Sequence, residues 1–395
     1  MSARLSDQDW LADPALHRVF EALDGQARVV GGCVRNALMG FPIDDVDVAT
    51  PLTPDAVTER LKAAGLKAVP TGIEHGTITA VADRRPFEIT TLRRDVTTDG
   101  RNATVAFTDD WSEDAGRRDF RLNALYADLD GTIFDPTGQG IADAEAGRIV
   151  FVGDPETRIR EDYLRILRFF RFFAWYGRGE PDAAGLRACA ALKDGMGRLS
   201  AERVSKELLK LLAAPDPRRT VRLMADAGVL ALVLPAAGSL DLFAAMVGVS
   251  TDPLLRLSAL LPDAPEAVGE AARALRLSNA EKDRLVLAVR DGPLDPGMGD
   301  AQARASLYRL GRARFEDQAR RAQAAGGDVS RLLDLAAAWP SLRMPVDGHA
   351  AKAAGATDGL AIGRALKAFE AEWIAADFPE TGHAERLARI VREQA

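Results

Sequence analysis

The chain has 395 residues, a net charge of −7 at pH 7, and 47% hydrophobic and 28% charged residues. This composition is typical of a globular protein with two or three domains and excludes collagen-like and disordered classes. Cys33 and Cys189 are too few for a disulfide framework or a cysteine-based zinc site. Because the sequence contains no run of 18 apolar residues and no signal-peptide pattern, we expect a cytoplasmic protein that does not enter a membrane.

Short strands and helices alternate in the first part of the chain and predict an α/β head over residues 1–150. We expect its elements in this order: strand 27–32, helix 33–40, strand 44–50, helix 53–61, strand 66–70 and an antiparallel hairpin over 75–93. The next stretch, 93–117, is polar and interrupted by glycine. It predicts a mobile loop.

Long apolar periodicity begins near Asp154, as in REDYLRILRFFRFFAWYG. The predicted fold class is therefore an α/β head followed by an all-α neck, body and tail. We expect the neck over 151–214 and the body and tail over 215–395. In the tail, the aromatic residues around Trp373 are interpreted as core.

Three aspartates, Asp44, Asp45 and Asp47, stand within four positions of the segment GFPIDDVDVAT. On a strand, Asp45 and Asp47 point to the same face. Two adjacent carboxylates repel unless a cation separates them, and Mg²⁺ prefers such oxygen ligands. The alternative is an ordinary solvated acidic turn, which is common for aspartate.

The segment VVGGCVRNALMG places two glycines between a strand and a helix that carries Arg35 near its start. Glycines allow backbone amides to approach an anion, and a helix N-terminus favours negative charge. The segment is neither a Walker A loop nor a dinucleotide-binding loop. It predicts a phosphate-binding turn, although such a glycine pair is often a tight turn and nothing more.

Five motifs occur together in order: VGGCVRNALMG, DDVDVAT, HGTIT, FEITTLR and RRDFRLNAL. This arrangement resembles the head of polymerase-β-type nucleotidyltransferases, specifically class II CCA-adding tRNA enzymes and bacterial poly(A) polymerases. Similarity continues through VGDPETRIREDYLRILRFFRF and LSAERVSKELLKLL.

The resemblance implies a role for several head residues. Asp45 and Asp47 are expected to be catalytic and to hold Mg²⁺, with Glu88 as a possible third carboxylate. Gly32 and Arg35 are expected to contact the nucleotide, with Arg118 supporting its phosphates. The sequence departs from the family at Asn36, where an aspartate is usual.

In REDYLRILRFFRF, Asp162 and Arg165 are three residues apart and are expected to share a helix face. A carboxylate accepts and a guanidinium donates hydrogen bonds, so the pair matches the Watson–Crick edges of cytosine and adenine. Guanine and uracil would leave buried groups mispaired. The resemblance gives Asp162 and Arg165 this role and adds Arg168 and Arg171 as nucleotide contacts.

The loop predicted at 93–117 is a candidate for the segment that changes the shape of the base-binding pocket between cytosine and adenine. In this hypothesis, Asp99 and Arg101 pair with Asp162 and Arg165. The alternative is an ordinary surface loop.

The predicted function is template-independent addition of CCA to the tRNA 3′ end from CTP and ATP, without an obligate protein partner. The net acidic charge disfavours non-specific nucleic-acid binding but allows a local basic surface. The alternatives are a poly(A) polymerase or A-only tRNA nucleotidyltransferase, and an inactive RNA-binding protein on the same scaffold.

Overall fold

The structure is a computed structural model that describes residues 3–5, 8–99, 102–290 and 292–394, apart from the side chains of 95–105. Contacts divide the chain into two compact units, Met1–Pro235 and Ala236–Ala395. The described strands all lie in the first unit, and the rest of the chain is helical. This pattern confirms the predicted fold class, while the boundaries at 150 and 214 stay predictions.

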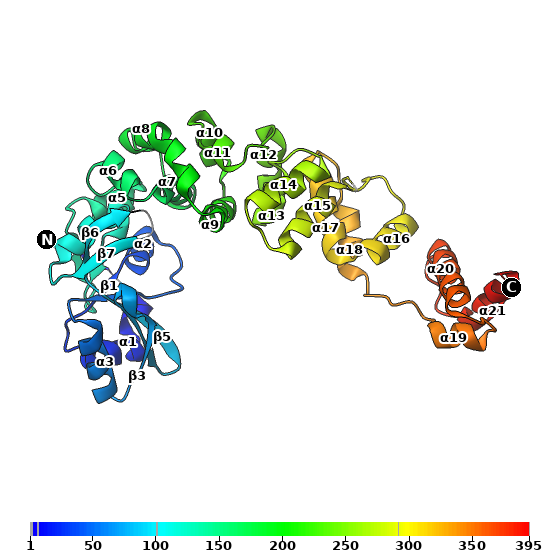
Figure 1. The fold of residues 1–395 in the computed structure, drawn as a ribbon, viewed down its shortest axis with the longest axis horizontal. Coiled ribbons are helices and arrows are strands. Elements are labelled where there is room, and N and C mark those ends of the chain that lie inside the picture. The colour runs from blue at the N-terminus through cyan, green and yellow to red at the C-terminus, as the bar shows by residue number, and fades with distance from the viewer. Residues whose placement is uncertain (1–2, 6–7, 100–101, 291, 395) are drawn as a thin grey trace. The chain divides into compact units, whose positions relative to one another are not determined.

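A mixed sheet forms the centre of the head (Figure 1). It has seven strands in the order β3-β4-β5-β2-β1-β8-β9. Its strands are β1 (Arg28–Val30), β2 (Val48–Thr50), β3 (Lys67–Gly72), β4 (Thr77–Ala82), β5 (Arg85–Thr91), β8 (Tyr126–Ala127) and β9 (Ile133–Phe134). Strands β2 and β5 run parallel, and the other neighbours are antiparallel. Helices α1 (Pro14–Ala22) and α3 (Pro54–Ala63) pack against β4, and α2 (Gly32–Met39) packs against β1.

Most of the segment predicted as a mobile loop at 93–117 has regular structure instead. Strand β6 (Arg93–Asp99) pairs with β7 (Asn102–Phe107), and helix α4 (Trp111–Gly116) follows. The threonines and valines of this segment favour strands. The prediction missed this local signal because the segment is polar.

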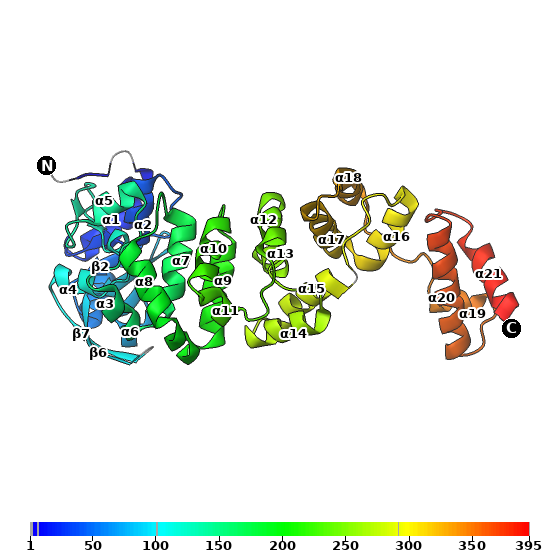
Figure 2. The same ribbon diagram turned by 90° about the horizontal axis from the view of Figure 1, so that it is seen from above.

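The neck packs on the head through buried phenylalanines. Phe120 of the head lies 4.9 Å from Phe151 and 5.2 Å from Phe172 between ring centroids, and Phe151 stacks on Phe169 at 5.7 Å. Helix α9 (Ala201–Leu212) packs along α7 (Leu164–Tyr176) (Figure 2). The helices that follow the sheet in this unit are α5 (Gly140–Ala146), α6 (Pro155–Glu161), α7 (Leu164–Tyr176), α8 (Ala183–Leu192), α9 (Ala201–Leu212), α10 (Arg218–Asp226) and α11 (Val229–Val233).

The second unit consists of ten helices among its described residues: α12 (Leu240–Val249), α13 (Pro253–Ser258), α14 (Pro265–Ala274), α15 (Asn279–Arg290), α16 (Asp300–Leu310), α17 (Arg312–Ala324), α18 (Ser330–Ala338), α19 (Gly348–Ala353), α20 (Gly359–Ala375) and α21 (His383–Gln394). Trp373 is 4% exposed and packs with Phe369 and Phe378, which confirms that these aromatics form core. Across the described residues, no helix has both the length and the apolar character needed to cross a membrane.

Candidate active site

The acidic segment lies mostly in a loop. Strand β2 covers Val48–Thr50, whereas residues 41–47 have no regular structure, so the strand predicted over 44–50 is wrong for its first four residues. The partner strand β1 ends at Val30, whose N–H donates to the Asp47 carbonyl at 2.9 Å. Pairing along this edge stops there, and the alternation argument does not apply to Asp45.

Asp47 nevertheless lies in the same electrostatic environment as Asp45 and Glu88. The parallel register of β2 and β5 places Glu88 beside Asp47. Burial raises the pKa of Asp47, and the negative charges of Glu88 and Asp45 raise it further. This corner of the head therefore concentrates negative charge.

The donor set suits a hard cation. Carboxylate oxygens are the ligands that Mg²⁺ prefers, and a cation among them would remove the repulsion that raises the pKa of Asp47. Within the described ranges, no group of three or more His, Cys, Asp or Glu side chains is already gathered closely enough to form a metal site. Asp45, Asp47 and Glu88 thus have suitable chemistry without a closed ligand cluster.

Helix α2 begins immediately after β1, at the predicted phosphate-binding turn. Gly31 has a φ of 71°, and an added Cβ there would lie 3.3 Å from the Arg118 guanidinium. Glycine is required at this position because of both the backbone conformation and this close approach. Gly31 and Gly32 both line the cavity described below, whereas the sequence indicated Gly32 alone.

Arg35 lines the same cavity, but its hydrogen bonds go to protein groups. Its guanidinium donates to Asn123 at 2.5 Å and to the Tyr176 hydroxyl at 2.9 Å, and it stacks 4.1 Å from the Tyr176 ring centroid. The side chain is 7% exposed. Arg35 therefore builds the wall of the cavity in addition to any contact with a nucleotide.

Asn36, the departure from the family pattern, connects Arg35 to the acidic loop. Its Oδ1 accepts two bonds from Arg35, at 2.8 and 3.1 Å, and its Nδ2 donates to the Pro42 carbonyl at 2.6 Å. An aspartate could accept from Arg35 but could not donate to Pro42. The Asn36 amide thus accepts hydrogen bonds from Arg35 and also holds the loop that carries Asp47.

We expect Asn36→Asp to reduce kcat about threefold to tenfold, because losing a hydrogen bond and placing a carboxylate against the Pro42 carbonyl costs roughly 1–2 kcal/mol. Single-turnover nucleotide incorporation measures this change. Asn279→Asp, an exposed change in α15, is the matched control. An equal or faster Asn36→Asp enzyme would show that the bond to Pro42 is not needed.

A buried carboxylate holds Arg118 at the cavity. Asp114 is 1% exposed and accepts from Arg118 at 3.0 Å, from Arg117 at 2.8 Å and from the Tyr126 hydroxyl at 2.6 Å. Burial alone would raise the pKa of Asp114, but Arg118 and Arg117 lower it to about 2. Asp114 therefore remains ionised and fixes both arginines.

Asp114→Asn should lower the free energy of unfolding at pH 7 by about 2 kcal/mol, from the shift of the Asp114 pKa from 3.8 to about 2. The folded pKa lies below the unfolded value, so this contribution is complete above about pH 4 and is lost as the pH falls toward 2. Urea unfolding from pH 7 to 3 measures it, with exposed Asp109→Asn as control. A deficit that does not shrink at low pH would contradict the ionic role.

The predicted base-reading residues lie at a break between two helices. Helix α6 ends at Glu161, Asp162 has an extended backbone with a φ of −153°, and α7 begins at Leu164. Asp162 and Arg165 therefore do not share one continuous helix as predicted, although both line the cavity. The Asp162 carboxylate accepts from the Leu164 N–H at 3.1 Å and from Arg203 at 2.6 Å.

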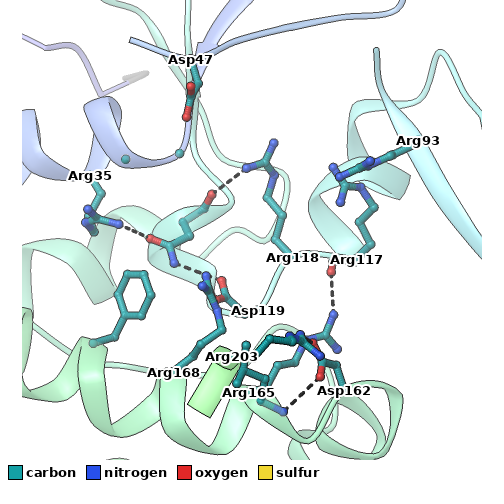
Figure 3. Close-up of a pocket in the computed structure, with 15 residues that line it drawn as sticks. Arg35, Asp47, Arg93, Arg117, Arg118, Asp119, Asp162, Arg165, Arg168 and Arg203 are labelled. Carbon is teal, nitrogen blue, oxygen red and sulfur yellow. Dashed lines mark hydrogen bonds and ion pairs between the residues drawn. The ribbon is translucent and has the colours of Figure 1, made fainter. Parts of the chain in front are cut away.

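Arg165 is held on the other side of this break. Its guanidinium pairs with Glu161 and donates to the carbonyls of Arg158, at 2.8 Å, and Arg117, at 3.2 Å. Asp162 pairs with Arg203 (Figure 3). Arg165 pairs with Glu161, so Asp162 and Arg165 do not pair with each other.

The next two arginines of α7 separate. Arg168 pairs with Asp119 at 2.6 Å and lines the same cavity as Asp162. Arg171 pairs with Glu207 at 2.5 Å and lines a neighbouring cavity instead. The predicted row of nucleotide contacts therefore splits between two cavities.

One cavity of about 540 Å³ joins the phosphate and base ends of the site. Asp47 enters it from the head, and Asp162 and Arg165 enter it from the neck (Figure 3). Its lining residues are Gly31, Gly32, Arg35, Asp47, Arg93, Arg117, Arg118, Asp119, Asn123, Asp162, Leu164, Arg165, Arg168, Phe172 and Arg203. Seven of these are arginines and three are aspartates, so the cavity suits a polyanion.

Several lining residues were not predicted from the sequence. Asp119 and Asn123 belong to the motif RRDFRLNAL, and the Asp119 carboxylate accepts from the Asn123 amide at 3.0 Å. Arg203 belongs to SAERVSKE, a motif that was used for the resemblance but was assigned no role. The sequence feature that could have predicted some of them is an arginine directly next to a predicted site residue, as Arg117 is next to Arg118.

The hypothesis that Asp99 and Arg101 pair with Asp162 and Arg165 lies outside the described residues, because the Asp99 side chain and Arg101 are not described.

Comparison with known proteins shows which family has this sequence and fold. The Poly A polymerase head domain matches residues 27–150, and the probable RNA and SrmB-binding site of polymerase A matches residues 182–240. CCA tRNA nucleotidyltransferase 1, mitochondrial, of Mus musculus is 35% identical over 387 residues, covering 91% of this chain and 85% of that protein. The chain belongs to the CCA-adding tRNA nucleotidyltransferase family.

Other members of the CCA-adding family agree with this assignment. The CCA-adding enzyme of Bacillus pumilus (strain SAFR-032) is 38% identical over 215 residues, covering 54% of this chain and 52% of that enzyme. A crystal structure of the Bacillus stearothermophilus CCA-adding enzyme in complex with CTP matches with a TM-score of 0.78 and 26% identity, covering 97% of this chain and 98% of that one. The predicted family is confirmed, and nucleotidyltransferases of this family normally use a divalent metal.

Proposed function

We propose that this protein adds CCA to the 3′ end of tRNA without a template, using CTP and ATP and releasing pyrophosphate. The observation that carries the proposal is one cavity containing Asp47 together with Asp162 and Arg165. A nucleotide bound there has its phosphates near the acidic loop and its base near the helix break. The relative crystallised with CTP supports this substrate class.

Asp45 and Asp47, with Glu88 as a third oxygen donor, would hold Mg²⁺. When bound, the metal lowers the pKa of an attacking hydroxyl and stabilises charge on the phosphates. Gly31 and Gly32 allow the backbone to approach the nucleotide closely. The positive charge of Arg118 attracts the negatively charged phosphates. Asp114 fixes Arg118 in place, so little reorganisation is needed during the reaction.

Asp162 and Arg165 select the base. Cytosine and adenine each present an amine donor beside a ring-nitrogen acceptor, which suits a carboxylate beside a guanidinium. For both groups to face the base, Asp162 must share or leave Arg203, and Arg165 must share or leave Glu161. The Arg168 guanidinium, held by Asp119, adds positive charge between the two ends of the cavity.

The test is incorporation into tRNA that lacks CCA, with each nucleoside triphosphate offered singly and then with CTP and ATP together. We expect cytidine addition from CTP, completion with ATP, and rejection of GTP and UTP. Open-ended adenosine tails on this tRNA or on an unstructured RNA would instead indicate a poly(A) polymerase. Addition of one adenosine to tRNA ending in CC, without cytidine addition, would indicate an A-only enzyme, and no incorporation would indicate an inactive RNA-binding protein.

Residues 215–395 are proposed to bind the tRNA body by shape and phosphate contacts, because A-form RNA exposes little readable sequence. The match to a probable RNA-binding model over residues 182–240 supports RNA contact at the start of this region. A cytoplasmic location stays a prediction, since the mouse relative is named as mitochondrial.

A further inference from the structure

A second cavity, of about 360 Å³, lies next to the nucleotide cavity. Arg35 and Phe172 line the first cavity, and Tyr176 lines the second. The Arg35 guanidinium contacts both rings, 5.2 Å from the Phe172 centroid and 4.1 Å from the Tyr176 centroid. These residues therefore form a common wall.

The loop that carries the catalytic candidate also serves both cavities. Phe41, Pro42 and Asp44 line the second cavity, while Asp47 lines the first. The other lining residues of the second cavity are Asn36, Arg171, Trp175, Tyr176 and Lys210. A molecule bound in the second cavity thus lies against the same short loop as Asp47.

The second cavity is lined with aromatic side chains that are half-buried. Phe41 meets Tyr176 edge to face, with centroids 5.2 Å apart. The Trp175 indole donates to the Lys210 carbonyl at 2.7 Å, which fixes that ring on α9. Aromatic rings at an open cavity are suited to stacking with nucleic-acid bases.

The charges of this cavity suit a phosphodiester rather than a triphosphate. It contains two cations, Arg171 and Lys210, against seven arginines in the first cavity. Arg171 is paired with Glu207, whereas exposed Lys210 has no ion pair with any residue that the structure describes. Asp44 also lines this cavity and can accept hydrogen bonds from hydroxyl or amine groups.

Nucleotidyl transfer supplies the reason for a second nucleotide site. The attacking hydroxyl and the leaving pyrophosphate lie roughly in line on either side of the reacting phosphorus. The RNA end must therefore approach Asp47 from a direction different from that of the triphosphate.

We propose that the second cavity binds the single-stranded 3′ end of the RNA acceptor, with a base stacked on the aromatic side chains and a phosphate facing Lys210. This inference rests on the proposed function, because it assigns the acceptor of the same reaction. The 3′-hydroxyl then reaches the acidic loop from the second cavity, and the triphosphate reaches it from the arginine-rich cavity.

The experiment compares Lys210→Ala with Lys206→Ala, which removes an exposed lysine from the same helix but outside both cavities. With tRNA lacking CCA, we expect Lys210→Ala to raise KM for the RNA about threefold to tenfold and leave KM for CTP within about twofold. Loss of one phosphate contact should also reduce the slope of log binding affinity against log salt by about 0.7–1. Lys206→Ala should change neither quantity.

A second measurement uses the same RNA with 2-aminopurine as its 3′-terminal base. Binding to the wild type should quench the fluorescence by stacking, Trp175→Phe should retain the quenching, and Trp175→Leu should reduce it. If Lys210→Ala leaves KM for RNA and the salt slope unchanged, or raises KM for CTP alone, the assignment of this cavity is overturned. A wild-type protein that incorporates no nucleotide into any RNA would instead overturn the proposed function.

Discussion

Asp47→Asn is expected to reduce nucleotide incorporation by about 10³-fold. A metal at a reacting phosphate stabilises the transition state by several kcal/mol, and an uncharged amide would hold the proposed Mg²⁺ much less well than a carboxylate. RNA binding measured by gel shift should persist, since the substitution leaves every arginine of the cavity in place. Glu59→Gln, an exposed carboxylate change on α3, is the control and should retain full activity.

The same substitution should leave the metal-free protein at least as stable as the wild type at pH 7. Burial and the charges of Glu88 and Asp45 raise the folded-state pKa of Asp47 above its unfolded value. A carboxyl with a raised folded pKa makes folding less favourable as the pH rises through that range. Asparagine removes this cost, and thermal unfolding in a chelator measures it. An Asp47→Asn protein that is clearly less stable, or that still incorporates nucleotides, would mean that the acidic corner is misassigned.

Asp162→Ala is expected to lower the preference for CTP over UTP by about 10²-fold or more, together with the rate. In the proposed function, the carboxylate accepts from the base amine, and a site that pairs all its polar groups with the correct base strongly rejects the wrong one. The ratio of kcat/KM for CTP and UTP on the same tRNA measures selectivity directly. Unchanged selectivity would contradict base reading by this side chain.

Arg203 provides the matched comparison, because it pairs with Asp162 at 2.6 Å from α9. Arg203→Ala retains the carboxylate but removes its positioning partner, so it should reduce selectivity less than Asp162→Ala. Arg203→Lys should recover part of the loss, since it restores the positive charge but not the planar guanidinium that makes this hydrogen bond. Equal losses in Arg203→Ala and Arg203→Lys, with no change in Asp162→Ala, would assign the selection to Arg203 instead.

The sequence by itself determined the fold class and the family, and its motifs predicted the site residues. Local features carry this information: the apolar periodicity after Asp154 specifies helices, and the glycine pair at 31–32 specifies a turn between strand and helix. The motif order then identifies the family without any knowledge of contacts. Asp47, Asp162 and Arg165 were assigned from motifs, and the structure brings all three to one cavity.

The tertiary structure alone decided which groups pair and where the elements end. Asp162 is close to Arg165 in sequence, yet its partner is Arg203, 41 residues away. Strand β2 begins at Val48 because its pairing with β1 ends there. The hairpin of β6 and β7 was missed because polar residues also favour loops, and strand pairing decides between the two. Local patterns specify element types, but packing between distant segments selects each ion pair and each boundary.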